Sequence, residues 1–347
     1  MKYIEARSIR DVDEEHWDSV TGNVLSMSHC WLRVMEAYWH SYGSSYLLME
    51  DEQGPCVAVV ANTAISFGNL GLLGWFYQQL SLAIHPPFSS MCGVMIRSGT
   101  SIESIMSHLE PALSQLCRRE KRLLLTIDNI VSSDLPAWRQ KGFMAFQQQG
   151  LNILDLPSTY DLYLDTLRPK DRSELRRIRK RGMELDVHFE IGPLANDGEQ
   201  IYALFCEVFA NHGTSPQAMS FNPDFFTGLE REMPGDVQFL RGYVGKNLAG
   251  VSLCLLNGST LWWPMAGLHH EIARPSYLYF LLIDEMIRWG IEHGVKKIFG
   301  GKTAGREKQR HGFHLEERWF CYRSNFRPLN PVLAFGFPLA QRLLRHS

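Results

Sequence analysis

The chain has 347 residues, more than one typical domain needs and suited to two domains of about 100–200 residues each. A net charge of −2, with 45% hydrophobic and 21% charged residues, is ordinary for a soluble globular protein and excludes a polyanion binder acting through its overall charge. The sequence has neither an apolar run long enough to span a membrane nor a signal-peptide core, so we expect a cytoplasmic protein whose seven cysteines are reduced.

The first half of the sequence alternates strand and helix patterns. Ser28 and Ser101 each precede apolar residues at helical spacing and suit the N-cap position. The polar turn at residues 51–54 separates two apolar runs and predicts a hairpin. We expect strands at residues 2–8, 46–50, 56–62, 122–127 and 151–156, helices at 12–20, 28–39, 102–120 and 135–141, and a long loop at 68–87.

The second half repeats this pattern. We expect helices at residues 200–211, 223–233 and 276–293, and strands at 237–244, 248–257, 259–266 and 297–300. In both halves a long helix leads directly into a short apolar strand, which indicates an architectural duplication. We therefore predict a mixed α/β (α+β) protein of two domains, residues 1–157 and 158–347, divided near Pro157.

The most basic segment is RPKDRSELRRIRKRG at residues 168–182, with eight basic and two acidic residues. Its Gly182 is typical of a helix end, so we expect the helix to stop there. On a helix, Arg172 and Arg176 share one face, because residues four apart are neighbours. Such a face suits the phosphates of a nucleotide, a coenzyme A (CoA) or a tRNA acceptor end. The alternative is a solvated surface helix without a ligand.

A glycine-rich loop follows the predicted strand at 297–300 and leads into a short basic segment. Lys302 and Lys308 in this region are candidates for meeting a phosphate or a developing oxyanion. The tetrapeptide GGKT is not a P-loop, because Lys296 stands where that pattern requires a glycine. His269 and His270 have no third ligand at metal spacing, so we expect no metal site, although either could act as a base.

Four segments carry a family resemblance: the basic run at residues 163–182, the helix at 201–213, the block at 278–313 and the aromatic tail at 319–322. The second half resembles the GNAT-like acyltransferases related to cellulose-biosynthesis accessory proteins and to the Fem-type aminoacyltransferases of peptidoglycan synthesis. The resemblance covers most of the chain and implies two GNAT-like domains in tandem, a degenerate one at 1–157 and an acyltransferase domain at 158–347.

The resemblance also implies a mechanism. In GNAT enzymes an amine attacks the donor carbonyl directly, and two splayed strands, here 261–266 and 297–300, offer N–H groups to the oxyanion. In Fem-type enzymes a lysine supports the reacting carbonyl, and Lys308 matches its position. The acetyl-CoA loop of standard GNAT enzymes is missing, because the region at 267–276 reads GLHHEIARPS and Arg274 is its only cation.

The expected activity is N-acyl transfer that forms an amide, with acyl-CoA or an acyl carrier thioester as donor and a small-molecule or peptide amine as acceptor. An aminoacyl-tRNA-dependent aminoacyltransferase is one alternative, and a non-catalytic binding module is another. The tRNA or an acyl carrier protein would be a partner, and no permanently bound cofactor is expected. We expect Lys308 to be catalytic and the following residues to bind substrate or donor: Arg172, Arg176, Trp263, His269, Arg274, Tyr277 and Lys302.

Overall fold

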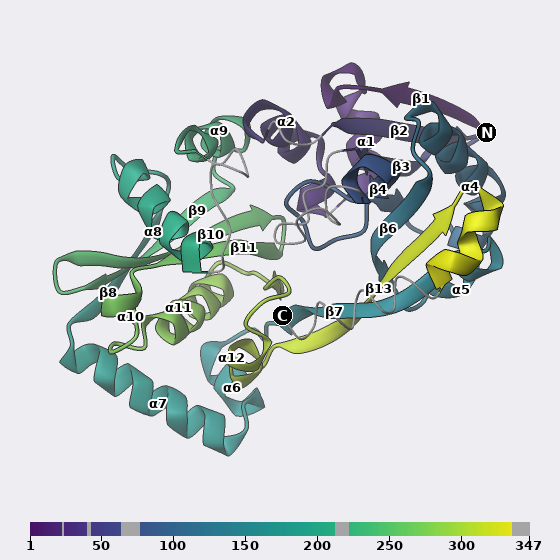
Figure 1. Ribbon diagram of the computed structural model, residues 1–347. Helices are drawn as coiled ribbons and strands as arrows, with labels where there is room; N and C mark the ends of the chain where they lie inside the picture. Colours follow the sequence, from purple (N-terminus) through teal and green to yellow (C-terminus); the bar gives the residue numbers. More distant parts are fainter. Residues whose placement is uncertain (23, 40–42, 64–76, 212–221, 335–347) are drawn as a thin grey trace. The chain divides into compact units, whose positions relative to one another are not determined.

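The computed structural model describes residues 1–22, 24–39, 43–63, 77–211 and 222–334, which form two compact units (Figure 1). Unit 1 contains Met1–Glu36, His40–Gln149 and Glu317–Ser347. Unit 2 contains Ala37–Trp39 and Gly150–Glu316. The division differs from the boundary expected at Pro157, since residues 150–157 belong to unit 2 and the chain returns to unit 1 at Glu317. Two strands, β7 (Met144–Asp155) and β13 (His314–Ser324), each contribute residues to both units.

The sheet of unit 1 has the strand order β1-β2-β3-β4-β6-β13, and β5 pairs with β3. All neighbours along this path are antiparallel except β4 and β6, which are parallel. The strands are β1 (Lys2–Ala6), β2 (Ser44–Asp51), β3 (Gly54–Asn62), β4 (Ser81–Ile84), β5 (Val94–Ile96) and β6 (Leu124–Val131); the helices are α1 (Glu14–Thr21), α2 (His29–Tyr38), α4 (Ile102–Arg119) and α5 (Leu135–Gln140).

The sheet of unit 2 has the order β7-β12-β11-β10-β9-β8. Its neighbours are antiparallel except β11 and β12, which are parallel. Helices α8 and α11 cover opposite faces of it (Figure 1). The strands are β8 (Val187–Gly192), β9 (Val237–Val244), β10 (Asn247–Asn257), β11 (Thr260–Leu268) and β12 (Lys297–Phe299); the helices are α6 (Tyr160–Thr166), α7 (Pro169–Glu184), α8 (Gly198–Asn211), α9 (Asp224–Glu232), α10 (His270–Ala273), α11 (Leu278–Glu292) and α12 (Gly305–Arg310).

The two units therefore share one pattern: a run of antiparallel strands, one parallel pair, and an antiparallel strand from the other half of the sequence. The expected duplication is confirmed at the level of strand pairing. It extends to the short helix after the parallel pair, where LPAWRQKGF at residues 135–143 matches GREKQRHGF at 305–313 in helix, glycine and phenylalanine positions. The two glycines, Gly142 and Gly312, have φ values of 79° and 81°, a conformation that suits glycine.

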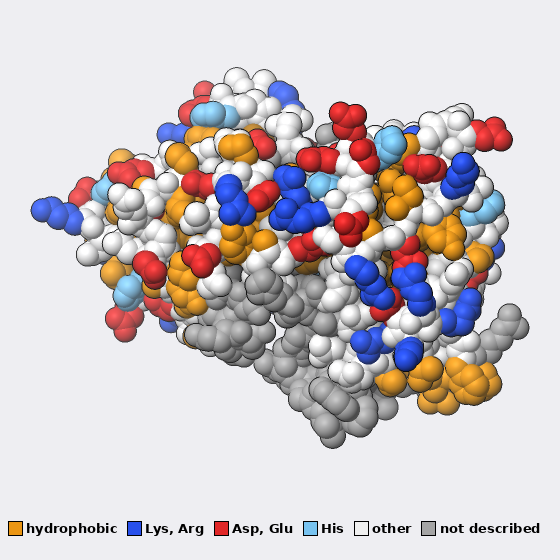
Figure 2. Space-filling view, turned by 90° about the horizontal axis from the view of Figure 1, so that it is seen from above, with side chains coloured by type: hydrophobic (Ala, Val, Ile, Leu, Met, Phe, Trp, Pro, Cys, Tyr) orange, Lys and Arg blue, Asp and Glu red, His pale blue; other side chains and the backbone are white. Residues whose placement is uncertain are grey.

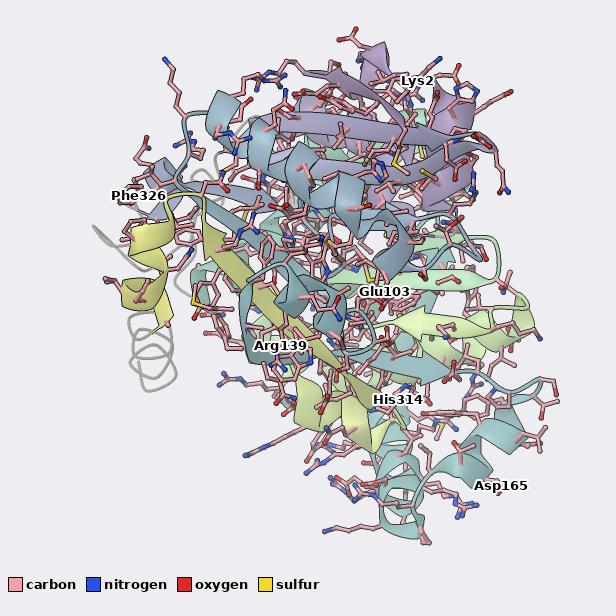
Figure 3. The ribbon with its side chains drawn as sticks, turned by 90° about the vertical axis from the view of Figure 1, so that its right-hand side faces the viewer. Lys2, Glu103, Arg139, Asp165, His314 and Phe326 are labelled. Carbon is pink, nitrogen blue, oxygen red and sulfur yellow. The ribbon has the colours of Figure 1, made fainter. Side chains whose placement is uncertain are left out.

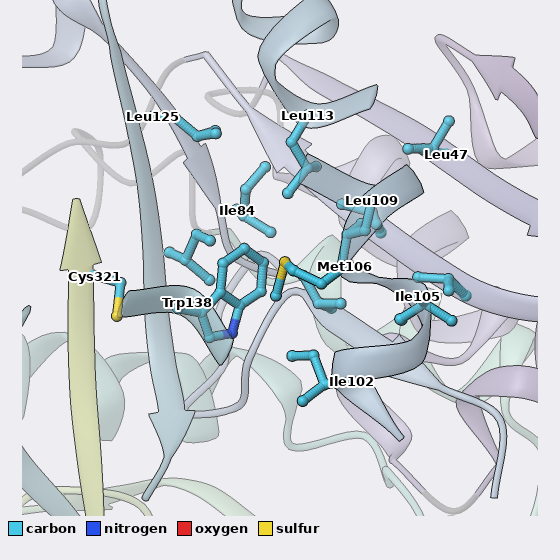
Figure 4. Packing of buried hydrophobic residues seen from close by; sticks show 14 of the residues in the cluster. Leu47, Ile84, Ile102, Ile105, Met106, Leu109, Leu113, Leu125, Trp138 and Cys321 are labelled. Carbon is cyan, nitrogen blue, oxygen red and sulfur yellow. The ribbon is translucent and has the colours of Figure 1, made fainter. Parts of the chain in front are cut away.

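Each unit has its own hydrophobic core. In unit 1, helix α4 begins at the N-cap Ser101 and places Ile105, Leu109 and Leu113 against the sheet, as its helical spacing predicts (Figure 4). Trp138 of α5 and Cys321 of β13 belong to the same cluster. In unit 2 the corresponding cluster forms between α11 and the sheet.

Three sequence-based expectations were wrong in detail. The loop expected at 68–87 contains strand β4, whose four buried residues lack the alternation that marks a strand; residues 68–76 lie outside the described part of the chain. Gly182 does not end α7, which continues to Glu184; a Cβ at this position would lie 2.7 Å from Cδ1 of Leu281, so the glycine allows close helix packing. Ser276 does not begin the long helix, because its hydroxyl donates to the carbonyls of Ile272 and Ala273.

Candidate functional site

The central feature of unit 2 is the point where β11 and β12 part. Their parallel pairing covers only three residue pairs and ends at Trp262 and Phe299. Strand β11 then continues to Leu268, while the chain after β12 turns into the glycine-rich loop. Backbone groups at the facing edges beyond this point are not used by β11–β12 pairing, so they are available to a ligand. Pro264 has no N–H, so it offers no hydrogen-bond donor on this part of β11.

The loop at residues 300–303 is fixed by hydrogen bonds that its carbonyl groups accept. The ammonium group of Lys308 donates to the carbonyls of Gly300 (2.5 Å) and Thr303 (2.9 Å). Asn152 of β7 donates to the carbonyl of Gly301 through both its backbone N–H (2.9 Å) and its side-chain amide (2.8 Å). Three carbonyls therefore face two buried side chains. The N–H groups of Gly301 and Thr303 make no hydrogen bond to any described residue, so they can donate to a ligand.

Lys308 lies on α12 and is 4% exposed. Besides these two carbonyls, the ammonium group contacts the ring of Trp263, whose centroid lies 4.5 Å from Nζ. Burial lowers the pKa of Lys308 to about 8. The predicted catalytic lysine is thus inside the site, but its direct contacts are the loop and the indole ring.

Asn152 is a site residue that the sequence reasoning missed. It is fully buried in β7, a strand that reaches unit 2 from the first half of the sequence. A buried amide needs hydrogen-bond partners; its Nδ2 donates to the carbonyls of Gly301 and Thr303, whereas its Oδ1 has no partner in the described part of the chain. The available signal was one asparagine within an otherwise apolar run, GLNILDL at 150–156, but nothing local to that run identifies its partners.

Aromatic rings line the same place. Trp263 contacts Tyr279 of α11, with ring centroids 6.0 Å apart, and Trp262 stacks on Phe299 at 4.3 Å on the β12 side. The indole N–H of Trp263 is buried and has no hydrogen-bond partner in the described part of the chain. Since a buried donor without a partner is costly, this N–H is a candidate to meet a polar ligand atom. Trp263, predicted to bind substrate, is thereby brought together with Lys308.

Helix α7 is more fully neutralised than its composition suggests. Five of its region's arginines form ion pairs: Arg168 with Asp171, Arg172 with Asp165 (2.7 Å; Asp165 is labelled in Figure 3), Arg177 with Glu174, Arg179 with Asp284 and Arg181 with Glu184. Arg179 turns inward to the buried Asp284. Arg176 is exposed, and no ion pair joins it to another described residue. Within the described ranges, no contact brings Arg172 or Arg176 to Lys308.

The connection between β11 and α11 contains three other predicted residues. His269 precedes α10, and its Nδ1 is buried without a hydrogen-bond partner among the described residues. Arg274 is exposed. Tyr277 precedes α11 with φ of 55°, and the guanidinium of Arg177 lies 5.0 Å from its ring centroid. Arg177, rather than Arg172 or Arg176, is therefore the cation that α7 brings to the start of α11. Lys302 is half-buried on the glycine-rich loop itself.

Other kinds of site find no support in the described part of the chain. It holds no group of three or more His, Cys, Asp or Glu side chains arranged to bind a metal ion. None of its helices combines the length and apolar character that crossing a membrane requires. Acidic and basic side chains are mixed on the face drawn in Figure 2, in keeping with the small net charge.

Comparison with known proteins identifies the family. The model of the FemAB-like family, described as peptidoglycan biosynthesis/recognition, matches residues 72–334. No curated protein matches the sequence. Because the family model matches more than half of the chain, the chain belongs to the FemAB-like family, and the Fem-type resemblance is confirmed.

Solved structures support the same fold. That of FemX has a TM-score of 0.63 at 12% identity and covers 96% of this chain and 100% of its own. The C-terminal domain of a putative lysylphosphatidylglycerol synthetase from Agrobacterium fabrum has a TM-score of 0.57 at 12% identity, with 92% and 95% covered. A tandem GNAT protein from the clavulanic acid biosynthesis pathway has a TM-score of 0.54 at 12% identity, with 93% and 98% covered. The expected GNAT fold is confirmed, and family and fold together make the chain an acyl or aminoacyl transferase.

Proposed function

We propose that unit 2 transfers an aminoacyl group from aminoacyl-tRNA to an amine of a peptidoglycan precursor peptide. The family description supports a role in peptidoglycan biosynthesis. The observation on which the proposal chiefly rests is the parting of β11 and β12 beside a loop whose carbonyls are held by Lys308 and Asn152. Such a donor is made in the cytoplasm, so the reaction would take place there.

The chemistry requires stabilisation of one oxygen. The amine nitrogen attacks the ester carbonyl carbon, the C–O bond to the tRNA ribose breaks, an amide bond forms, and the amine proton leaves to the ribose oxygen or to water. Negative charge develops on the carbonyl oxygen meanwhile. Preorganised N–H groups at Gly301 and Thr303 can stabilise it. Lys308 adds positive charge behind the loop and keeps the N–H groups oriented.

No covalent intermediate on the enzyme is needed. The two cysteines of unit 2 are Cys206 and Cys254, and burial raises the pKa of the Cys254 thiol to about 12. A thiol with so high a pKa is protonated at neutral pH and is a poor nucleophile. We therefore expect direct transfer within a complex of donor, acceptor and enzyme.

The connection between β11 and α11 favours a donor other than CoA. Helix α10 and the buried Ser276 occupy the stretch where an acetyl-CoA enzyme of this fold would carry its glycine-containing phosphate loop. That arrangement disfavours CoA, and it leaves the exposed Arg274 and the start of α11 for a different anion. Arg172 and Arg176 of α7 remain the proposed contacts for tRNA phosphates.

The test is a transfer assay with separate donors. Purified protein is mixed with a precursor peptide bearing a free amine and with a radiolabelled aminoacyl-tRNA pool, acetyl-CoA or a long-chain acyl-CoA. An amide product from aminoacyl-tRNA supports the proposal. A product from acyl-CoA alone would replace it by N-acyl transfer, and binding of the peptide without product from any donor would indicate a binding module. Intact-mass spectrometry after incubation with donor alone should show no stable adduct.

A further inference from the structure

Unit 1 contains a cavity that has no part in the proposed transfer. Its volume is about 690 Å³, which is typical of small-molecule binding sites. Residues of α4, of the end of α5 and of the end of β13 line it, and all of them belong to unit 1. The cavity is therefore complete within this unit.

One side of the cavity is a network of hydrogen bonds around Arg323 of β13. The guanidinium group of Arg323 donates to the carboxylate of Glu110, to the hydroxyl of Ser114 (2.8 Å) and to the carbonyl of Lys141 (2.6 Å). Burial opposes ionisation of Glu110, but the hydrogen bonds from Arg323 and Ser114 hold the pKa of its carboxyl group below the ordinary value. Glu110 is therefore ionised at neutral pH, and Arg323 balances its charge.

Two further cations line the same cavity. Arg118 lies in the last turn of α4, and Lys141 directly follows α5. No ion pair or hydrogen bond joins the guanidinium group of Arg118 or the ammonium group of Lys141 to another residue in the described part of the chain. Because the remaining lining residues are neutral, the cavity has an excess of two positive charges.

The helix dipole alone explains a basic residue near the C-terminus of a helix. It does not explain why two such residues line one cavity together with a third cation. Another cavity of unit 1, of about 970 Å³, is lined by the carboxylates of Glu50, Asp51 and Glu52 and by the cationic side chains of Lys2 and Arg97. An excess of positive charge is therefore not a general feature of the cavities in this unit.

We propose that unit 1 binds a phosphate-bearing small molecule in this cavity, with Arg118 and Lys141 holding the phosphate oxygens. Guanidinium and ammonium groups form strong, charge-assisted hydrogen bonds with phosphate. Gln140, exposed at the end of α5, adds a neutral donor beside them. Pro111 is the only apolar side chain of the lining, which favours a polar, soluble ligand over a lipid. This binding does not depend on the proposed transfer reaction.

The experiment measures binding of inorganic pyrophosphate to the full-length protein by isothermal titration calorimetry at low salt, where exposed charges are least screened. We expect saturable binding that Arg118→Met/Lys141→Met weakens roughly tenfold to a hundredfold, the usual effect of losing hydrogen bonds to a charged group. Arg10→Met/Lys246→Met removes the same charge from exposed positions elsewhere and should bind as the wild type does. Undiminished binding by Arg118→Met/Lys141→Met, or no saturable binding by the wild type, would overturn the proposal.

A second pair of variants tests the sign of the charge that the cavity requires. Gln140→Glu adds one negative charge to the lining and should weaken pyrophosphate binding several-fold. Gln200→Glu adds the same charge at the exposed start of α8 in unit 2 and should leave binding unchanged. Equal binding by these two variants would contradict the proposal.

Further variants separate this site from those proposed in unit 2. Arg172→Ala/Arg176→Ala and Lys308→Met should keep full pyrophosphate binding, so failure of the transfer reaction and failure of this site give different results. Displacement of pyrophosphate by glucose 6-phosphate supports a soluble ligand. Displacement only by vesicles that contain phosphatidic acid would overturn the assignment to a small molecule.

Discussion

At the scale of single residues, the site depends on how two buried polar side chains are satisfied. Lys308 and Asn152 come from α12 and β7, and both donate to carbonyls of the loop at 300–303. An ammonium group buried in this way is held at a cost, because removal from water disfavours its charged form. We propose that the buried ammonium group offsets this cost through function, because its positive charge lies next to the loop that faces the reacting carbonyl.

The depressed pKa of Lys308 predicts how stability depends on pH. In the unfolded chain this group titrates near 10.5, whereas in the folded protein it titrates near 8. Between these values the unfolded state binds more protons, so the free energy of unfolding should rise with pH, by up to about 3 kcal/mol relative to Lys308→Met. Urea unfolding of both proteins across this range measures the difference. A difference that stays constant would show that the ammonium group is not buried as described.

Asn152 gives a second prediction at this scale. Asn152→Leu keeps the volume but removes the amide donor from the carbonyls of Gly301 and Thr303, at a cost of about 1–3 kcal/mol in stability. We expect kcat for transfer to fall while KM for aminoacyl-tRNA stays near its wild-type value. The substitution changes the orientation of the loop but removes no contact with the aminoacyl-tRNA. Asn247→Leu, at an exposed strand start, is the control. An unchanged kcat would make Asn152 a purely structural residue.

At the scale of elements, α7 shows how far sequence patterns reach. Its helical character and basic content were predictable, because both are local. Its ion pairs with Asp165 and Asp284 were not, since these partners lie on other elements. For the same reason Lys308 could be singled out from the sequence through family resemblance, but its contacts with Gly300, Thr303 and Trp263 could not.

The basic helix makes a prediction about donor binding. Arg172→Ala/Arg176→Ala should weaken binding of tRNA and reduce the slope of log affinity against log salt by up to about 2, since each phosphate contact contributes slightly less than one. Arg168→Ala/Arg181→Ala removes the same charge from the two ends of the helix and should change the slope less. Filter binding over a salt series measures both. Equal effects of the two double variants would show that α7 attracts tRNA through its overall positive charge and not through Arg172 and Arg176 in particular.

At the scale of the whole molecule, the two units exchange strands. Unit 2 includes the end of β7 from the first half of the sequence, and unit 1 includes most of β13 from the second half. The duplicated pattern of elements was predictable from helix and strand periodicity. The exchange of β7 and β13 was not, because a strand's own residues do not specify a partner that lies far away in the sequence. This is why the division at Gly150 and the return to unit 1 at Glu317 differ from a single boundary at Pro157.

The exchange predicts that unit 1 depends on the C-terminal strand. Ending the chain after Glu316 removes the part of β13 that pairs with β6, including the buried Cys321. Amides of β6 should then lose their protection in hydrogen exchange, because an inner strand becomes an edge. Cys321→Asp in the full-length chain should weaken the same protection by burying a charge. Full protection of β6 in the shortened chain would contradict the assignment of β13 to unit 1.

If unit 2 transfers an aminoacyl group at the loop held by Lys308, transfer should depend on this lysine and not on an exposed one. Transfer from aminoacyl-tRNA to a precursor peptide is followed for wild type, Lys308→Met and, as the control for loss of a lysine, the exposed Lys296→Met. We predict amide formation by wild type and Lys296→Met, and a fall in kcat of roughly 10²–10³ for Lys308→Met with little change in donor affinity, as expected when transition-state charge loses its support. Turnover by Lys308→Met within about twofold of wild type would contradict the claim.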